Sequence, residues 1–331
     1  MLSPFTGKEM IVRKEWRALA YKKEEFRVCF HTWRCENTGE QFEDDQFAQL
    51  NFEQVQNQYR AKYALPFREE IIAIREKYDL TAIKMSHVLG FGDNTYRQYE
   101  AGEMPSQANA RLIQMAANPV DLRHLAKISN ALEGAPLEKL NRRLDHLIQE
   151  EIKGMTNKTI TDYFFGTNLP NNFTGFRKPD MNKFAEMVLF FSEKLKPWKT
   201  KLNKLLFYTD FTNFSLTGTS MSGAIYRAMP MGPVPDKFQG IFNYLTNENV
   251  VDISETNFGN GLGEQFLPVK GRSFNPALFT ENELSVLNSI ADKFSDTSTN
   301  DIIEISHKEK AWLENKENKN IIDYFYGFDL N

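Results

Sequence analysis

A short polar segment that follows a glycine-rich break carries residue types able to hydrogen-bond to the edges of DNA bases. Asparagine and glutamine can pair with adenine, and arginine with guanine. The break lies at residues 90–92, and the segment stops at Gly102, which predicts a helix of about two turns. Tyr96 and Tyr99 are expected on its inner side, from which a hydroxyl could reach a phosphate. The residues that we expect to contact DNA are Asn94, Thr95, Tyr96, Arg97 and Gln98.

A second set of side chains could do acid–base chemistry if they converged in the fold. The candidates are Tyr208, Asp210, Tyr226, Arg227 and His307. The chain has no C-x-x-C, H-E-x-x-H, phosphate-loop or G-x-S-x-G motif. Tyr208 and Asp210 fall inside an amphipathic pattern, where a buried hydroxyl with a fixed partner is the ordinary outcome. We therefore expect a protein that is not an enzyme and that needs no cofactor.

Two pieces near the N-terminus have the form of zinc-ribbon knuckles, "SPFTGK" at residues 3–8 and "CENTGE" at residues 35–40. Tetrahedral zinc in such a ribbon needs two pairs of thiolates. The four ligand positions here are Ser3, Thr6, Cys35 and Thr38. Hydroxyls are poor zinc ligands, so we expect a ribbon without metal. The alternative is a site completed by Cys29 and His31, although "VCFHTW" alternates like a strand and places both on one face.

Composition and charge limit the classes of function. The chain has 331 residues with 41% hydrophobic and 25% charged residues, which is typical of a globular protein with two or three domains. Its net charge is −4, and residues 66–154 hold 12 basic against 13 acidic side chains. DNA binding would therefore depend on a local patch, doubled in a homodimer. With two cysteines, no apolar run of membrane length and no secretory signal, we expect a cytoplasmic protein without a membrane segment.

The hydrophobic patterning predicts a multidomain, mainly α chain in four parts. Residues 1–65 form a small β-rich ribbon and linker, and residues 66–154 an all-α helix-turn-helix domain with extra helices. Pro66 is expected to open a helix and Thr81 to cap the next one. Residues 155–180 are a linker or a segment pinned against a neighbour, and residues 181–331 form an α+β domain.

The N-terminal third resembles a known family. "LTAIKMSHVLGFGDNTYRQYEAGEMPS" looks like the Xre-type helix-turn-helix of MqsA-family antitoxins, and "CENTGEQF" is similar to part of that family's N-terminal zinc domain. The resemblance covers about residues 1–117 and implies that Asn94 and Gln98 occupy base-reading positions. The family commonly has an arginine where Gln98 stands, whereas this chain has Arg97 one residue earlier. It also implies that the ribbon is one candidate for toxin binding.

The C-terminal part resembles a second family. "LNKLLFYTDFTNFSLTGTSMSGAIYRAMPMGPVP", together with "ISHKEKAW", looks like the Panacea (SocA-like) domain over about residues 181–328. The resemblance implies neutralisation of a toxin by direct binding. Met, Tyr and Arg are enriched at protein interfaces, although the composition of "AIYRAMPMGPVP" suits a core-facing turn equally well. The resemblance to the Panacea domain implies that this segment is the contact surface. The toxin-binding residues that we expect are Tyr208, Asp210, Tyr226, Arg227, Met229 and Met231.

Together these patterns predict a cytoplasmic antitoxin of a type II toxin–antitoxin pair. Its partners would be a cognate toxin protein, operator DNA and a second copy of itself. The alternatives are a stand-alone transcriptional regulator whose C-terminal domain senses a ligand or partner, and a proteolytic adaptor that delivers another protein to a protease.

Overall fold

The computed structural model describes residues 2–3, 6–167, 169–257, 259 and 262–331. About half of the chain is helical, and the sheets are small. The chain divides into two compact units. Unit 1 consists of Met1–Gln58 and Thr161–Asn331, and unit 2 of Tyr59–Ile160. Pro4 and Phe5 of the first predicted knuckle lie outside the described residues. None of the helices in the described ranges is both long enough and apolar enough to cross a membrane.

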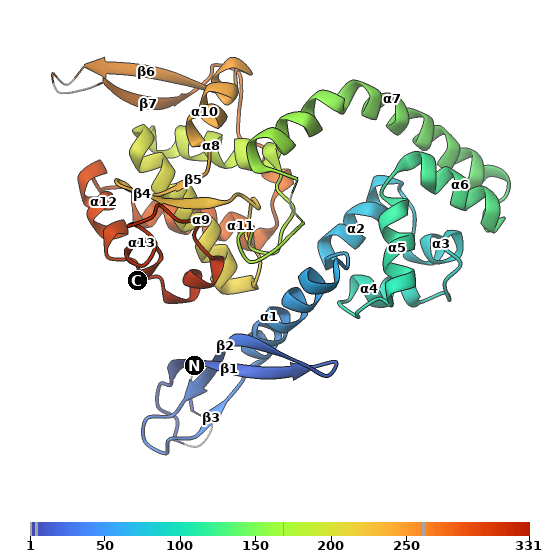
Figure 1. Cartoon of the computed structure of the whole chain (residues 1–331), viewed down its shortest axis with the longest axis horizontal. Helices are drawn as coiled ribbons and strands as arrows, with labels where there is room; N and C mark the ends of the chain where they lie inside the picture. The colour runs from blue at the N-terminus through green and yellow to red at the C-terminus, as the bar shows by residue number, and fades with distance from the viewer. Residues whose placement is uncertain (1, 4–5, 168, 258, 260–261) are drawn as a thin grey trace. The chain divides into compact units, whose positions relative to one another are not determined.

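Unit 2 is all helical. Its helices are α2 (Arg68–Lys77), α3 (Ala82–Val88), α4 (Thr95–Glu100), α5 (Gln107–Ala116) and α6 (Pro119–Ser129), with the adjoining parts of α1 (Asp45–Tyr63) and α7 (Gly134–Phe165). They surround one core of buried side chains that includes Ile71, Met85, Tyr96, Ile113 and Leu122. Thr81 caps α3 by accepting from the Lys84 amide, as predicted, whereas α2 begins at Arg68, two residues after Pro66. This order is helix, short helix, turn, short helix, helix (Figure 1).

The N-terminal part of unit 1 is an antiparallel sheet in the order β1-β2-β3. The strands are β1 (Ile11–Tyr21), β2 (Glu24–Arg34) and β3 (Gln41–Phe42), and Trp16 stands opposite Cys29. The first two strands have 11 residues each and are longer than the pattern suggested. In the two predicted knuckles the amide of Gly7 donates to the Ser3 carbonyl, and that of Gly39 to the Cys35 carbonyl.

The C-terminal part of unit 1 is built around α9 (Lys199–Thr217), which has 13 buried residues (Figure 1). The other elements are α8 (Met181–Leu195), β4 (Tyr226–Met229), β5 (Gly232–Pro235), α10 (Phe238–Asn247), β6 (Val251–Asn257), β7 (Leu262–Pro268), η1 (Pro276–Leu278), α11 (Glu281–Lys293), α12 (Thr299–His307), α13 (Lys310–Leu313) and η2 (Tyr324–Asp329). The strands form two separate hairpins, β4-β5 and β6-β7. A long helix with so few exposed residues acts as the core of its domain.

The segment before α8 is held against the loop after α9. Ser220 donates from its hydroxyl to the Thr174 carbonyl at 2.7 Å and from its amide to the Gly175 carbonyl at 2.8 Å. Gly175 has φ +58°, and a Cβ there would lie 2.5 Å from the Ser220 Cβ, so only glycine fits. Of the two interpretations of residues 155–180, the pinned segment describes 171–180, while α7 continues to Phe165.

Within unit 1 the N-terminal sheet packs directly on the C-terminal part. Lys14 donates to the Phe328 carbonyl at 2.8 Å, and the Trp16 ring lies 5.9 Å from that of Phe325. Asn57 in α1 donates to the Gly218 carbonyl at the end of α9, at 3.1 Å. The ribbon and the C-terminal part therefore share a packed interface.

Candidate functional site

The outer face of α4 presents polar side chains that have no partner in the described parts of the chain. Asn94, Arg97 and Gln98 are exposed, and Thr95 is half-buried. Asn94 precedes the helix, yet its side chain makes no capping hydrogen bond there. No hydrogen bond or ion pair within the described ranges uses the side chains of Asn94, Arg97 or Gln98. Their amide and guanidinium groups are therefore available to a ligand.

The inner face of α4 is built from tyrosines, as predicted for Tyr96 and Tyr99. Tyr96 is fully buried, and its hydroxyl donates to the Ile71 carbonyl at 2.7 Å. Burial raises the pKa of this hydroxyl well above its usual range. The Tyr96 amide donates to the Ser86 hydroxyl at 3.0 Å, which ties α4 to α3. The expectation that Tyr96 contacts DNA is corrected by this position, because its side chain is core.

The two knuckles bring the predicted zinc-ligand positions together around one thiol. Cys35 is buried, and the Thr6 hydroxyl lies 3.4 Å from its sulfur. Hydrogen bonds from Thr38, Thr6 and Ser3 lower the pKa of the Cys35 thiol to about 6. Hydroxyls thus stand where a zinc ribbon has thiolates.

The alternative zinc pair has other contacts. His31 lies against the Cys29 carbonyl through Nδ1 at 2.7 Å, and its ring packs against Phe47 and Phe328. Burial raises the pKa of Cys29 to about 11 and lowers that of His31. The described residues contain no group of three His, Cys, Asp or Glu side chains placed to hold a metal ion.

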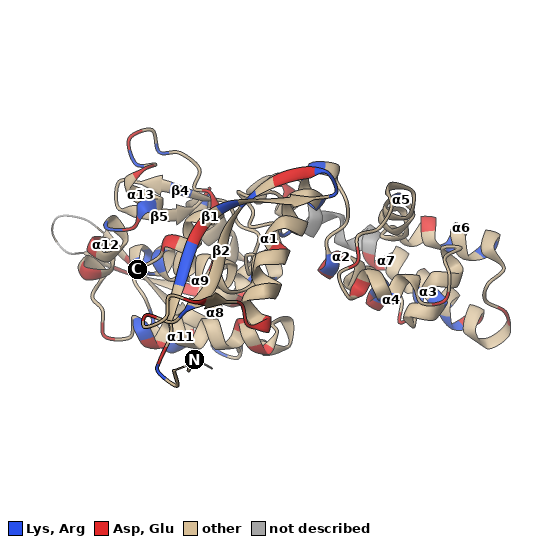
Figure 2. Ribbon diagram, turned by 90° about the horizontal axis from the view of Figure 1, so that it is seen from below, with Lys and Arg blue, Asp and Glu red and all other residues tan. Residues whose placement is uncertain are grey.

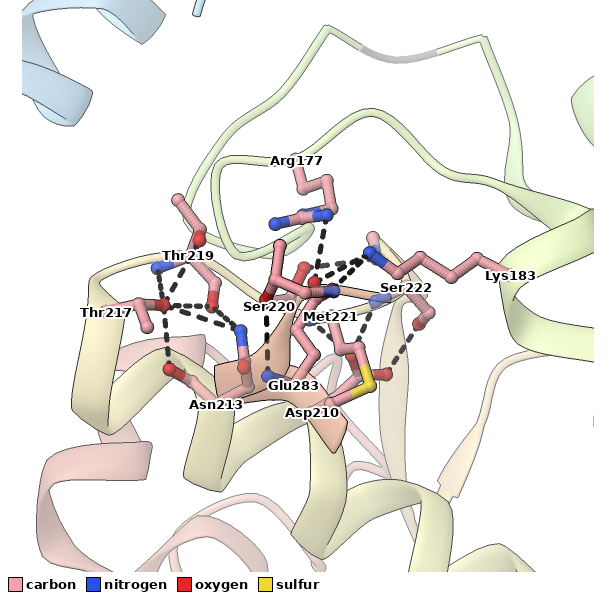
Figure 3. Close-up of polar contacts among 12 residues, drawn as sticks. Arg177, Lys183, Asp210, Asn213, Thr217, Thr219, Ser220, Met221, Ser222 and Glu283 are labelled. Carbon is pink, nitrogen blue, oxygen red and sulfur yellow. Dashed lines mark hydrogen bonds and ion pairs between the residues drawn. The ribbon is translucent and has the colours of Figure 1, made fainter. Parts of the chain in front are cut away.

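Asp210 is the centre of a buried clamp in the C-terminal part (Figure 3). Its Oδ1 accepts from the amides of Met221 at 2.8 Å and Ser222 at 2.7 Å. Its Oδ2 accepts from the Ser222 hydroxyl at 2.6 Å and from the Tyr226 hydroxyl at 2.8 Å. Burial raises the pKa of Asp210, and these hydrogen bonds oppose that shift. The clamp fixes the loop between α9 and β4.

The acid–base candidates have different partners and form no common site. Tyr208 donates to the Glu309 carboxylate at 3.1 Å, whereas Asp210 pairs with Tyr226. His307 stacks on Trp312 with ring centroids 3.8 Å apart. Tyr208, Asp210 and Tyr226 are all buried, so the expectation that they contact a toxin is corrected to a structural role.

Three of the six expected toxin contacts remain near the surface, in the β4-β5 hairpin. Arg227 is half-buried and bonds to Asp236 at 3.1 Å and to the Lys319 carbonyl at 3.0 Å. Met229 is half-buried, and its carbonyl accepts from the Trp312 ring at 2.8 Å. Met231 lies at the turn with 54% of its surface exposed. The hairpin is thus anchored on one side and presents a methionine on the other.

Sequence reasoning missed the buried lysines, among them Lys183 and Lys204. Lys183 of α8 binds both carboxylate oxygens of Glu283, at 2.6 and 2.8 Å, and Arg177 approaches the same carboxylate at 3.3 Å. Lys204 of α9 is fully buried, and its ammonium donates to the Pro233 carbonyl at 2.9 Å. Burial lowers the pKa of Lys204 to about 7. The available signal was the position of both lysines among apolar residues of α8 and α9.

Comparison of the sequence with known protein families gives one match. Residues 202–313 match the family described as Antitoxin SocA-like, Panacea domain. The match starts in the first turn of α9 and ends with α13, and it covers about a third of the chain. It confirms the predicted Panacea resemblance for these residues and supports an antitoxin role. No curated protein and no solved structure gives a significant match.

Proposed function

We propose that the protein is the antitoxin of a toxin–antitoxin pair, acting in the cytoplasm by binding its cognate toxin directly. The observation that carries this proposal is the match of residues 202–313 to the Antitoxin SocA-like, Panacea domain. The hairpin β4-β5 lies within the matched residues and offers the exposed Met231. A flexible, polarizable methionine and an anchored arginine in one hairpin are residue types that are enriched at protein interfaces.

The toxin contact that we propose is centred on the turn of this hairpin. The Trp312 ring holds the Met229 carbonyl, and Asp236 and the Lys319 carbonyl hold Arg227, so the turn is positioned before a partner arrives. A pre-positioned surface loses less conformational entropy on binding. The exposed turn, and not the buried tyrosines, is therefore where a substitution can weaken toxin binding without disturbing the fold.

We further propose that unit 2 binds operator DNA and so regulates the protein's own synthesis. Support comes from the helix order of α2 to α5 and from the outward Asn94, Arg97 and Gln98 on the helix after the turn. Because residues 66–154 are slightly acidic overall, specific contacts and a paired half-site must supply much of the affinity. The predicted homodimer meets that requirement.

The experiment is co-expression of the full chain with the protein encoded by the neighbouring gene, scored by growth and by co-purification. We expect growth to be rescued and the two proteins to purify together. A full-length chain is needed, since residues 1–58 pack with 161–331 in one unit and a shortened chain would uncover that interface. Growth arrest that persists despite a well-folded, abundant chain would reject the antitoxin role.

DNA binding is tested separately, by gel shift of the chain with its own promoter. Retarded promoter DNA that an unrelated duplex does not compete away is the expected result. Equal affinity for both duplexes would show that unit 2 does not recognise a DNA sequence. The antitoxin proposal would not be affected, because the toxin assay tests it separately.

A further inference from the structure

The outer edge of β1 has no partner strand within the described part of the chain. In the sheet order β1-β2-β3, β1 pairs only with β2. The opposite edge of β2 is covered by α1, where Gln54 bonds to the amide and carbonyl of Cys29 and Asn51 to those of His31. A long uncovered edge is a template for pairing with another strand.

The contacts of α1 establish which residues of β1 point outward. Cys29 and His31 direct their backbone groups away from β1, so the even-numbered residues of β2 bond to β1. These are paired with odd residues of β1, for example Phe30 with Glu15 and Val28 with Arg17. The backbone groups at the free edge therefore belong to the even residues. They are Val12, Lys14, Trp16, Ala18 and Ala20, all of them exposed.

We propose that this edge pairs with the same edge of a second copy of the chain, antiparallel about a two-fold axis at Trp16. In this register Trp16 faces Trp16 of the second copy, Lys14 faces Ala18 and Val12 faces Ala20. Each of these pairs joins even residues, as the outward backbone groups require. All 11 residues of β1 overlap, and two three-stranded sheets become one continuous sheet.

The charges of β1 select this register over its neighbours. Glu15 then lies opposite Arg17 of the second copy, and the two-fold axis repeats the pair. These are non-hydrogen-bonded positions, where facing side chains lie closest. Sliding the second copy by two residues in one direction places Glu15 opposite Glu15, and in the other direction it places Arg17 opposite Arg17. Both alternative registers bring like charges together, which is unfavourable. Figure 2 shows the basic and acidic residues interspersed along β1.

The apolar side chains of β1 also suit a second copy. Val12 and Trp16 have 43% and 39% of their surfaces exposed although they lie in a paired strand. In the dimer each comes to lie beside a side chain of the other copy on the same face of the sheet, and two tryptophans meet at the axis. Aromatic pairs across strands are stabilising. This dimer would bring two copies of unit 2 into one particle, independently of any toxin.

The test is sedimentation equilibrium of the full-length protein without DNA or toxin, over a range of concentrations. We expect a reversible dimer. Glu15→Arg and Arg17→Glu should each weaken it roughly tenfold, because each places like charges opposite one another twice. The double variant Glu15→Arg/Arg17→Glu recreates both opposite-charge pairs and should recover dimerisation. Glu255→Arg, a charge reversal on the exposed strand β6, is the control and should leave the dimer unchanged.

A second variant tests the backbone pairing itself. Ala18→Pro removes an amide that points outward, so it spares the hydrogen bonds to β2 and should abolish the dimer while circular dichroism remains that of the wild type. A monomer at all concentrations would overturn the proposal and show that the charges only protect the edge. A dimer that resists Ala18→Pro, or that the double variant fails to restore, would also overturn it.

Discussion

Replacement of Lys204 should change the free energy of unfolding in a direction opposite to that of most core substitutions. Its side chain is fully buried, and its one side-chain hydrogen bond among the described residues is to the Pro233 carbonyl. No ion pair within the described residues involves Lys204. A buried ammonium without a carboxylate is costly. We predict that Lys204→Met, which keeps the length and removes the charge, stabilises the protein at neutral and acidic pH.

The magnitude follows from the pKa. Burial lowers the pKa of Lys204 from 10.5 to about 7, and each unit is worth about 1.4 kcal/mol. Below pH 7 the lysine is charged in both states, so the folded protein bears the full cost, about 5 kcal/mol. Methionine leaves the Pro233 carbonyl without its donor, which costs about 1 kcal/mol. The expected net gain at pH 6 is therefore roughly 4 kcal/mol.

The gain should depend on pH in a defined way. Between pH 7 and 10.5 the unfolded chain holds the proton and the folded chain releases it, so wild-type stability from this group rises with pH. The difference between Lys204→Met and wild type should therefore shrink toward pH 10. Urea unfolding at pH 6, 8 and 10 measures it, with the exposed Lys308→Met as control. A difference that stays constant with pH would refute the assignment of an uncompensated buried charge.

Three further predictions concern the proposed surfaces. Arg97→Ala should lower specific affinity for the promoter by about 1–3 kcal/mol in gel shifts without changing the melting temperature, whereas Tyr96→Phe, which removes a buried hydroxyl, should lower the melting temperature instead. Met231→Asp should abolish both the rescue of growth from the toxin and co-purification, while Leu278→Asp, at a similarly exposed apolar position, should not. Equal effects of the two substitutions would show that the toxin contact is not at Met231. Tyr226→Phe should cost about 1–2 kcal/mol of unfolding free energy in urea and leave rescue intact; lost rescue in a fully stable Tyr226→Phe protein would restore this tyrosine as a toxin contact.

Local signals made much of unit 2 predictable. The turn at Gly90, which has φ +71°, and the cap at Thr81 depend only on residues that are close in the sequence. The tyrosines of α4 recur at helical spacing. When a short helix has one buried and one exposed face, the spacing of its apolar and polar residues indicates which side chains are buried. The exposed positions of Asn94 and Arg97 follow from the same periodicity. The length of β1 and its packing on η2 could not be predicted in this way, because they depend on contacts more than 300 residues apart, such as that of Lys14 with Phe328.

The central helix α9 was less predictable for a physical reason. It is buried on nearly all sides, so a polar residue in it does not mark a solvent face. The patterning of α9 allows Tyr208 and Asp210 to be buried with fixed partners, and the Panacea resemblance places them among the expected toxin contacts. In the structure their partners are Ser222, Tyr226 and Glu309. Four donors surround the Asp210 carboxylate, and only the fold brings them together.

The contrast between the buried polar residues of α9 and the exposed turn of the β4-β5 hairpin indicates where specificity for a partner resides. The segment that matches the Panacea family includes Lys204, Asp210 and Tyr226, and all three make internal contacts. Such residues determine the shape of the domain, and any chain that folds in this way can use them whatever its partner. A side chain that distinguishes one toxin from another must be exposed in the free protein. Within the hairpin Met231 meets that condition, and Arg227 meets it in part, so a search for altered toxin specificity should begin with these two positions.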